Sequence, residues 1–390
     1  LRSREDLFDI YIQPLIWGRT SWLSEQNEER SFIDSAIEKT IGFIQQGGKF
    51  DMSLQVTIPN EFEKLAMVNI GYTAGIETTV TSAEWLAKIN EVVDSVIVVS
   101  SFSTSAFKST EYTGEVNGRP AVLNLEKPID YVNYAVKDYE DTAPLELDLE
   151  YDFNFLSVAQ WGPRKNMSAT VNWFVSEFHD EEVGLVLKTN LAKNCIMDQE
   201  AMLRTLKEEL AGKYPNKKCK IYLIHGDMSE KEMHALYKNP KLKATVSFAH
   251  GEGFGLPLFE AAYSGMPVVS TGWSGQLDFL CDENGKEHFY NVSFDINKVP
   301  EHALWEAVIV KDAMWAYPRE QSAREQMRAC YNDIITNGNT KALEYAEELK
   351  VRFSKEKMYE KFVNLLEEQA PAHTVVNDMD EIEKLFSEAL

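Results

Sequence analysis

The stretch that decides the fold of this chain reads ATVSFAHGEGFGLPLFEAAYSGMPVVST and spans residues 244–271. Its first residues, Ala244–Ala249, are mostly apolar, as in a buried strand of a parallel sheet. A glycine-rich turn follows, and Pro257 then stands where a helix would begin, a position that favours proline. Gly265 ends that helix, and the apolar run 268–271 predicts another strand. The stretch therefore predicts a strand–turn–helix–strand unit of an α/β sheet.

The same rhythm continues on both sides of this unit. In the N-terminal half the patterns predict strands at 8–15, 52–57, 64–72 and 95–99 and helices at 29–46 and 83–90. In the C-terminal half they predict strands at 153–159, 183–188, 220–225, 244–249 and 268–271 and helices at 166–178, 201–212, 229–238 and 257–265. From about Trp305 the pattern becomes mostly helical.

An acidic segment without periodicity, residues 134–151, separates the two halves and is the predicted linker, with a surface loop inside one domain as the alternative. We therefore expect an α/β protein with two Rossmann-like domains that face a cleft, the usual place for a ligand. The expected boundaries are 1–148 for the N-terminal domain and 149–350 for the C-terminal domain. Residues 351–390 are expected to form C-terminal helices that pack back on the N-terminal domain, with an acidic tail.

Composition limits the function further. The chain has 390 residues and a net charge of −23, which argues against a nucleic-acid backbone as partner and leaves only a local basic pocket open. The four cysteines form no CxxC motif, which favours reduced thiols and a cytoplasmic location. No apolar run approaches the roughly 18–20 residues of a membrane span. The first residues do not resemble a signal peptide, but the chain lacks an initiator Met, so a lost targeting segment stays open.

The glycine-rich turn has the features of an anion site. Glycines allow a ligand to approach the backbone closely, and the following helix offers free N–H groups and its positive end. Glu252 lies in the turn and Glu260 is expected in the first turn of the helix. Two carboxylates beside an anion site suit a phosphate that is attached to a hydroxyl-rich group. Chance is the alternative, because acidic residues are abundant and a Glu near a helix start is favourable without any function.

A second segment, SVAQWGPRKN at 157–166, places Arg164 and Lys165 after the first strand of the C-terminal half. Adjacent cations at that position suit a diphosphate, since a charge-assisted hydrogen bond contributes roughly 1.5–3 kcal/mol. A solvated surface pair is the ordinary alternative.

The run from Glu252 to Glu260, EGFGLPLFE, followed by Gly265-Met266-Pro267-Val268-Val269, resembles the Glu-x7-Glu signature of retaining GT-B glycosyltransferases of family 4. The resemblance implies that Glu252 contacts the donor sugar and Glu260 the ribose. It also implies that Arg164 and Lys165 clamp the diphosphate. The backbone that would lie against the sugar and diphosphate is that of Gly253, Phe254, Gly255 and Leu256. Ala159-Gln160 departs from the Arg that many members carry there.

Weaker likenesses complete the picture. IYLIHGDMSE at 221–230 resembles the loop that receives the nucleobase, with Met228 as the backbone contact. IGYTAGIETT at 70–79 and VVSSFSTSAF at 98–107 resemble parts of the acceptor domain. They make Glu77 and Thr78 acceptor-side candidates, although Glu-Thr-Thr also suits a helix cap. Gly18 is a third candidate, because the usual Gly-Gly loop of the family after the first strand is reduced to this one glycine. All seven histidines follow position 178, so the acceptor-domain His of many members is absent.

The resemblance implies transfer of a sugar, with retention, from a nucleoside diphosphate sugar, UDP- or GDP-linked, to a hydroxyl acceptor such as a glycan. The sugar nucleotide would be a co-substrate, so we expect no cofactor and no metal site. The alternatives are a nucleotide-sugar epimerase or phosphorylase on the same fold, a non-catalytic sugar-nucleotide-binding subunit, and a glycosyltransferase that acts on modified DNA.

Overall fold

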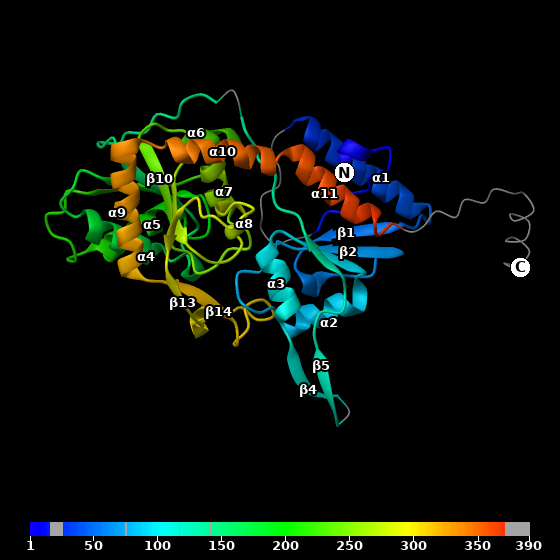
Figure 1. Cartoon of the computed structure of the whole chain (residues 1–390). Helices are drawn as coiled ribbons and strands as arrows, with labels where there is room; N and C mark the ends of the chain where they lie inside the picture. The colour runs from blue at the N-terminus through cyan, green and yellow to red at the C-terminus, as the bar shows by residue number, and fades with distance from the viewer. Residues whose placement is uncertain (16–25, 75, 117, 140–141, 371–390) are drawn as a thin grey trace, which may run out of the picture.

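The structure, a computed structural model, describes residues 1–15, 26–74, 76–116, 118–139 and 142–370. Two lobes stand side by side, and each is built on a parallel sheet with helices packed against it (Figure 1). The expected α/β class is therefore confirmed. Gly18 lies outside the described residues.

The N-terminal lobe holds a four-stranded parallel sheet in the order β1-β2-β3-β6. Its strands are β1 (Met52–Val56), β2 (Val68–Tyr72), β3 (Ser95–Val98) and β6 (Ile129–Tyr131). The helices of this lobe are α1 (Glu28–Gln45), α2 (Ala83–Val92) and α3 (Ser101–Ser109). Helix α2 begins at Ala83 because the Ser82 side chain accepts a hydrogen bond from the Trp85 N–H, which satisfies a free donor of the first turn. An antiparallel hairpin of β4 (Tyr112–Val116) and β5 (Arg119–Leu123) projects from this lobe (Figure 1).

The C-terminal lobe holds a six-stranded parallel sheet in the order β12-β11-β10-β7-β8-β9. Its strands are β7 (Asn154–Val158), β8 (Gly184–Lys188), β9 (Lys220–Ile224), β10 (Leu242–Ser247), β11 (Val268–Thr271) and β12 (Tyr290–Val292). Its helices are α4 (Met167–Phe178), α5 (Ile196–Leu210), α6 (Glu230–Tyr237), α7 (Leu256–Tyr263) and α8 (Leu277–Leu280). The chain runs outward from β7 to β9 on one side and from β10 to β12 on the other. The strand order therefore reverses between β7 and β10, and ligands of such sheets bind at this switch point.

Three helices close the described chain: α9 (Glu320–Asn337), α10 (Thr340–Arg352) and α11 (Lys355–Glu367). Helix α10 packs on α7 of the C-terminal lobe, and α11 lies across the N-terminal sheet (Figure 1). There Leu366 of α11 packs with Ile70 and Ile97. The expected boundaries at 148/149 and 350/351 stay predictions.

One of the expected strands is wrong. Residues 8–15 form no strand, because the Ile12 N–H donates to the Thr40 hydroxyl of α1 instead of a neighbouring strand. The region after Trp305 is mostly helical, as expected, but β14 (Met314–Pro318) pairs antiparallel with β13 (Phe294–Lys298) before α9 begins. Among the helices that are described, none has the length and hydropathy needed to cross a bilayer.

Candidate active site

The candidate site lies where β7 and β10 end side by side at the switch point. Both strands are parallel, so their carboxyl ends open at the same edge of the sheet. The loop after β7 carries Arg164 and Lys165, and the loop after β10 carries Glu252. The fold thereby brings together side chains that lie almost ninety positions apart in the sequence.

These three side chains form a compact ion-pair cluster. The Lys165 Nζ lies 2.5 Å from Oε1 of Glu252, and Nη1 of Arg164 lies 3.1 Å from Oε2. Arg164 also donates to the Gly251 carbonyl at 2.7 Å. Glu252 is only 7% exposed, and its backbone N–H donates to the Ser274 hydroxyl. Both carboxylate oxygens are therefore occupied by cations, and the backbone that carries them is held in place.

Charge pairing affects the pKa of Glu252 more strongly than burial does. Burial would raise the pKa of Glu252, but the Lys165 and Arg164 cations hold that pKa below its usual value. Burial lowers the pKa of Lys165, and the Glu252 charge only partly opposes this shift. The pKa of Arg164 is raised: burial would lower it, but the charges of Glu252 and Glu77 prevail. The pairing therefore favours the charged forms of Glu252 and Arg164.

The N-terminal lobe touches the glycine-rich loop directly. A Cβ added at Gly253 would stand 2.6 Å from the Ala74 carbonyl oxygen, and one added at Gly251 would collide with the Glu77 carbonyl. Glycine is thus required here for the approach of a second backbone as well as for any ligand. The Glu77 carboxylate crosses the interface and lies 3.3 Å from Nη2 of Arg164.

The turn into α7 has the expected form. Gly255 adopts φ +94°, a left-handed conformation that favours glycine, and α7 starts at Leu256 with Pro257 in its first turn. The Phe254 side chain is buried in an apolar cluster with Phe259.

A cavity of about 280 Å³ adjoins the ion-pair cluster at the ends of β7 and β8. Lys165 lines it together with Lys188, Asn190, Asn194 and Met233, which the sequence analysis missed. Three of these lie at or after the end of β8, so the rule that parallel strands bind ligands at their carboxyl ends would have found them. The Lys188 Nζ donates to the Gly226 carbonyl at 2.5 Å and ties the cavity to the loop after β9.

Glu260 and Met228 stand apart from the cluster. Glu260 is the fifth residue of α7, not part of its first turn as expected, and its side chain lies beside the buried Tyr237 of α6. Burial raises the pKa of the Glu260 carboxyl, which the neighbouring Tyr237 hydroxyl only partly offsets. Met228 packs with Met233 in an apolar cluster beneath the loop after β9.

The two acceptor-side candidates in the described chain differ. Glu77 joins the cluster, but Thr78 is only 1% exposed and its hydroxyl donates to the Val80 carbonyl at 2.8 Å. Thr78 is therefore committed to its own loop. The alternative role of Glu-Thr-Thr as a helix cap is also wrong, because Ser82 caps the following helix α2. Over the described ranges, no group of three or more His, Cys, Asp or Glu side chains is arranged to hold a metal ion.

Part of the chain matches a known protein family, and the fold resembles solved structures. Residues 153–294 match the family described as glycosyl transferases group 1. The solved structure of a glycosyltransferase from Rickettsia africae ESF-5 is similar at a TM-score of 0.56 and 14% identity, over 90% of this chain and 84% of that one. A second, described as trehalose-6-phosphate from E. coli bound with UDP-2-fluoro glucose, has a TM-score of 0.51 and 9% identity, over 90% and 80% of the two chains.

Against a mutant of S. aureus TarM the TM-score is 0.45 at 14% identity, and the match covers 77% of this chain but only about half, 51%, of that one. No curated protein sequence matches the chain. The two higher-scoring likenesses confirm the GT-B fold. The segment that matches the family of glycosyl transferases group 1 contains Arg164, Lys165, Glu252 and Glu260.

Proposed function

We propose that this enzyme moves a sugar, with retention of configuration, from a nucleoside diphosphate sugar to a hydroxyl group of a glycan or other acceptor. The observation that carries the proposal is the ion-pair cluster of Arg164 and Lys165 around the buried Glu252 at the switch point of the sheet. Two cations beside a glycine loop and a helix N-terminus suit a diphosphate, and a carboxylate among them suits sugar hydroxyls.

The roles follow from the surroundings of each group. Arg164, Lys165 and the first turn of α7 hold the diphosphate. The backbone from Gly253 to Leu256 lies against the sugar and diphosphate. The adjoining cavity takes the nucleoside, with Lys188 and the Met228 loop at its rim. UDP- or GDP-linked donors are favoured, and the E. coli structure bound with UDP-2-fluoro glucose supports the former. The ribose contact of Glu260 is part of the proposal by resemblance alone, because its described neighbours belong to α6 and not to the cavity.

Catalysis would be mainly electrostatic. As the bond to the diphosphate breaks, negative charge develops on the leaving oxygen, and the preorganised cations stabilise it without reorganisation. Both oxygens of Glu252 are engaged by cations, which argues against this carboxylate as a covalent nucleophile. We therefore adopt a same-face attack assisted by the leaving phosphate. Because Arg164 and Lys165 supply the positive charge, the proposal needs neither a metal nor a cofactor. The cytoplasmic location stays a prediction.

A screen by thermal shift against UDP-, GDP-, ADP- and TDP-sugars tests donor binding. A donor at 100 times its dissociation constant adds about 2.7 kcal/mol to the free energy of unfolding. The anomer of the product, read by NMR, then tests the stereochemistry. No shift with any of these donors would overturn the donor assignment, and an inverted product would overturn the mechanism. Release of free epimerised donor, or cleavage that depends on phosphate, would favour the epimerase or phosphorylase alternative.

A further inference from the structure

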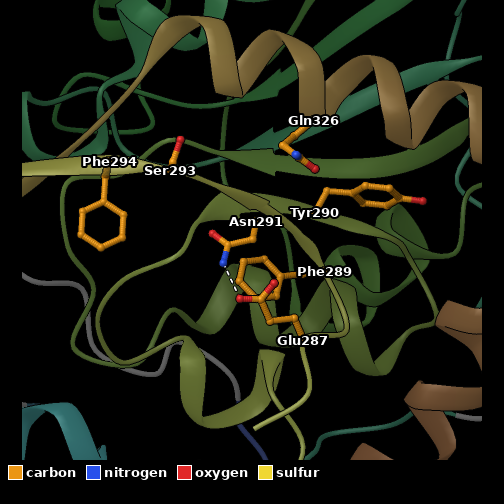
Figure 2. Close-up of a pocket in the computed structure, with 7 residues that line it drawn as sticks. All are labelled: Glu287, Phe289, Tyr290, Asn291, Ser293, Phe294 and Gln326. Atoms are coloured by element: carbon orange, nitrogen blue, oxygen red, sulfur yellow. Dashed lines mark hydrogen bonds between the residues drawn. The ribbon is translucent and has the colours of Figure 1, made fainter.

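A second cavity, about 550 Å³ in volume, lies along β12, the edge strand of the six-stranded sheet opposite to β9. Figure 2 shows the residues that line it. The cavity runs along β12, from Glu287 before the strand to Phe294 after it, and Gln326 of α9 reaches it from the neighbouring helix. We propose that this cavity is a subsite for the neutral oligosaccharide part of the acceptor. The inference rests on the proposed sugar transfer and extends it.

The lining has the chemistry that uncharged sugars require. Phe289 and Phe294 offer aromatic rings on which the apolar faces of sugar rings pack. The amides of Asn291 and Gln326 each donate and accept hydrogen bonds, as hydroxyl groups do. Among the described residues that line the cavity, none is a Lys, an Arg or a His, whereas the active site has two cations for its anion. A phosphate or a sulfated chain would find no counter-charge among these residues.

Part of the polar lining is already ordered. The Asn291 amide donates to Oε1 of Glu287 at 2.5 Å, so both side chains are held before any ligand arrives (Figure 2). A preorganised group loses less conformational entropy on binding. The carbonyl side of the Asn291 amide lies against Gly272, where an added Cβ would collide with it.

The strand itself argues for a sugar over a peptide. β12 is an edge strand of three residues that pairs with β11 alone within the described sheet. The Val292 carbonyl accepts a hydrogen bond from the Gly272 N–H, so the backbone of Val292 faces β11. The backbone groups of the residues on either side, Asn291 and Ser293, therefore point away from the sheet. Of these, Ser293 is already bonded to Arg319 and to Ser322. Within the three described residues of β12, only Asn291 is left for an added strand, which is too little for peptide pairing of the kind that long edges support.

The position fits an acceptor that extends away from the reaction centre. β12 lies two strands from β10, or about 10 Å at 4.7–4.9 Å per strand. It lies on the side opposite to the nucleoside cavity at β7 and β8. Gly272, which touches Asn291, is two residues from Ser274, whose hydroxyl holds the backbone of Glu252. An acceptor of a few sugar units therefore reaches from one site to the other.

The test measures binding of neutral tetrasaccharides of glucose and of N-acetylglucosamine by calorimetry, without nucleotide. Gln326→Trp should fill the cavity and abolish binding, and Gln326→Ala should weaken it about 3–10-fold, as expected for one hydrogen bond. Gln321→Trp is the matched control, because it makes the same replacement at an exposed position on the same helix. Unfolding temperature shows that each variant is folded.

With the donor present, Gln326→Trp should raise KM for a tetrasaccharide acceptor and leave KM for a monosaccharide acceptor and kcat unchanged. Failure of every tetrasaccharide to bind, equal binding by Gln326→Trp and the wild-type protein, or binding of extended peptides instead would overturn the subsite. Binding that Gln326→Trp abolishes, in a protein that transfers no sugar from any donor, would keep the subsite and overturn the proposed function.

Discussion

The two lobes each present a carboxylate to Arg164, and these two faces, here called the C-terminal wall and the N-terminal wall, differ in how the carboxylate is held. On the C-terminal wall, the Glu252 side chain is 9% exposed, with both oxygens paired and its backbone N–H bonded. On the N-terminal wall, the Glu77 side chain is 32% exposed and reaches Arg164 through one contact of 3.3 Å. The first arrangement is made by the fold of one lobe, and the second exists only while the lobes meet.

This difference separates two kinds of effect. Changes on the C-terminal wall remove charges that compensate each other in a buried place, so they should reduce stability and donor binding. Changes on the N-terminal wall should leave the folding of each lobe intact and act on the approach of the lobes. The predictions below are ordered by expected size.

The largest effect is expected for Glu252→Ala. The substitution leaves the partly buried Arg164 and Lys165 without their main partner, and breaking a buried ion pair costs up to roughly 3–5 kcal/mol. The free energy of unfolding, measured with urea, should fall by that amount, and sugar transfer should be lost. Glu325→Ala, at an exposed position of α9, is the control and should change stability by less than about 0.5 kcal/mol. An equally small effect of both substitutions would show that the ion pairs of Glu252 with Arg164 and Lys165 do not stabilise the fold.

The pH dependence of stability checks the same pair independently. The pKa of Glu252 in the folded protein lies below its usual value, so its stabilisation is complete above about pH 4.3, the ordinary pKa of a glutamate. It is lost as the pH falls through the folded pKa. The wild-type protein should therefore lose its stability advantage over Glu252→Ala on acidification. A difference that stays constant with pH would contradict the assigned charge.

Lys165→Met should affect the donor more than the fold. Arg164 still pairs with Glu252 in this variant, and the pKa of Lys165 shows that its charge is already penalised by burial. Loss of one charge-assisted bond to the diphosphate should lower kcat/KM by about ten- to hundredfold, or roughly 1.5–3 kcal/mol. Lys193→Met, at an exposed position before α5, is the control. Unchanged donor affinity in Lys165→Met would show that the diphosphate does not bind at Lys165.

The sequence predicts the C-terminal wall better than the N-terminal one for a physical reason. The turn, the helix start and the paired cations of the C-terminal wall are local patterns, and a parallel sheet brings its strand ends to one edge. The contact of Gly253 with Ala74 depends instead on how the two lobes meet, and no pattern in the sequence predicts that arrangement. Thr78 shows the same limit, because its role was read from a motif while its hydroxyl is bonded within its own loop.

The strand expected at 8–15 fails for a related reason. Its residues are apolar enough for a strand, but they pack against α1, and a side-chain hydroxyl takes the N–H that a neighbouring strand would use. The hairpin β4–β5 and the pair β13–β14 were missed because short antiparallel strands give weaker patterns than buried parallel ones.

Gly253→Ala should disturb the meeting of the lobes. The new Cβ would stand 2.6 Å from the Ala74 carbonyl, which is backbone and has no flexible end to move away. Overpacking of this kind costs roughly 1–3 kcal/mol, so transfer should fall by about five- to hundredfold while each lobe keeps its own secondary structure. Gly162→Ala is the matched control, because no atom lies within 4 Å of its added Cβ. Circular dichroism and activity of both variants distinguish this from general misfolding.

The smallest effect is expected for Glu77→Gln. This change keeps the size of the side chain and removes only a partly exposed charge, and such pairs contribute roughly 0.2–1 kcal/mol. Transfer should fall by less than about fivefold, and the gap to the wild-type protein should shrink further in high salt, which screens exposed pairs. A loss of a hundredfold that salt does not change would show that Glu77 acts on the substrate itself. The N-terminal wall would then contribute to the chemistry as directly as Glu252 does, and the difference between the two walls would lie in burial alone.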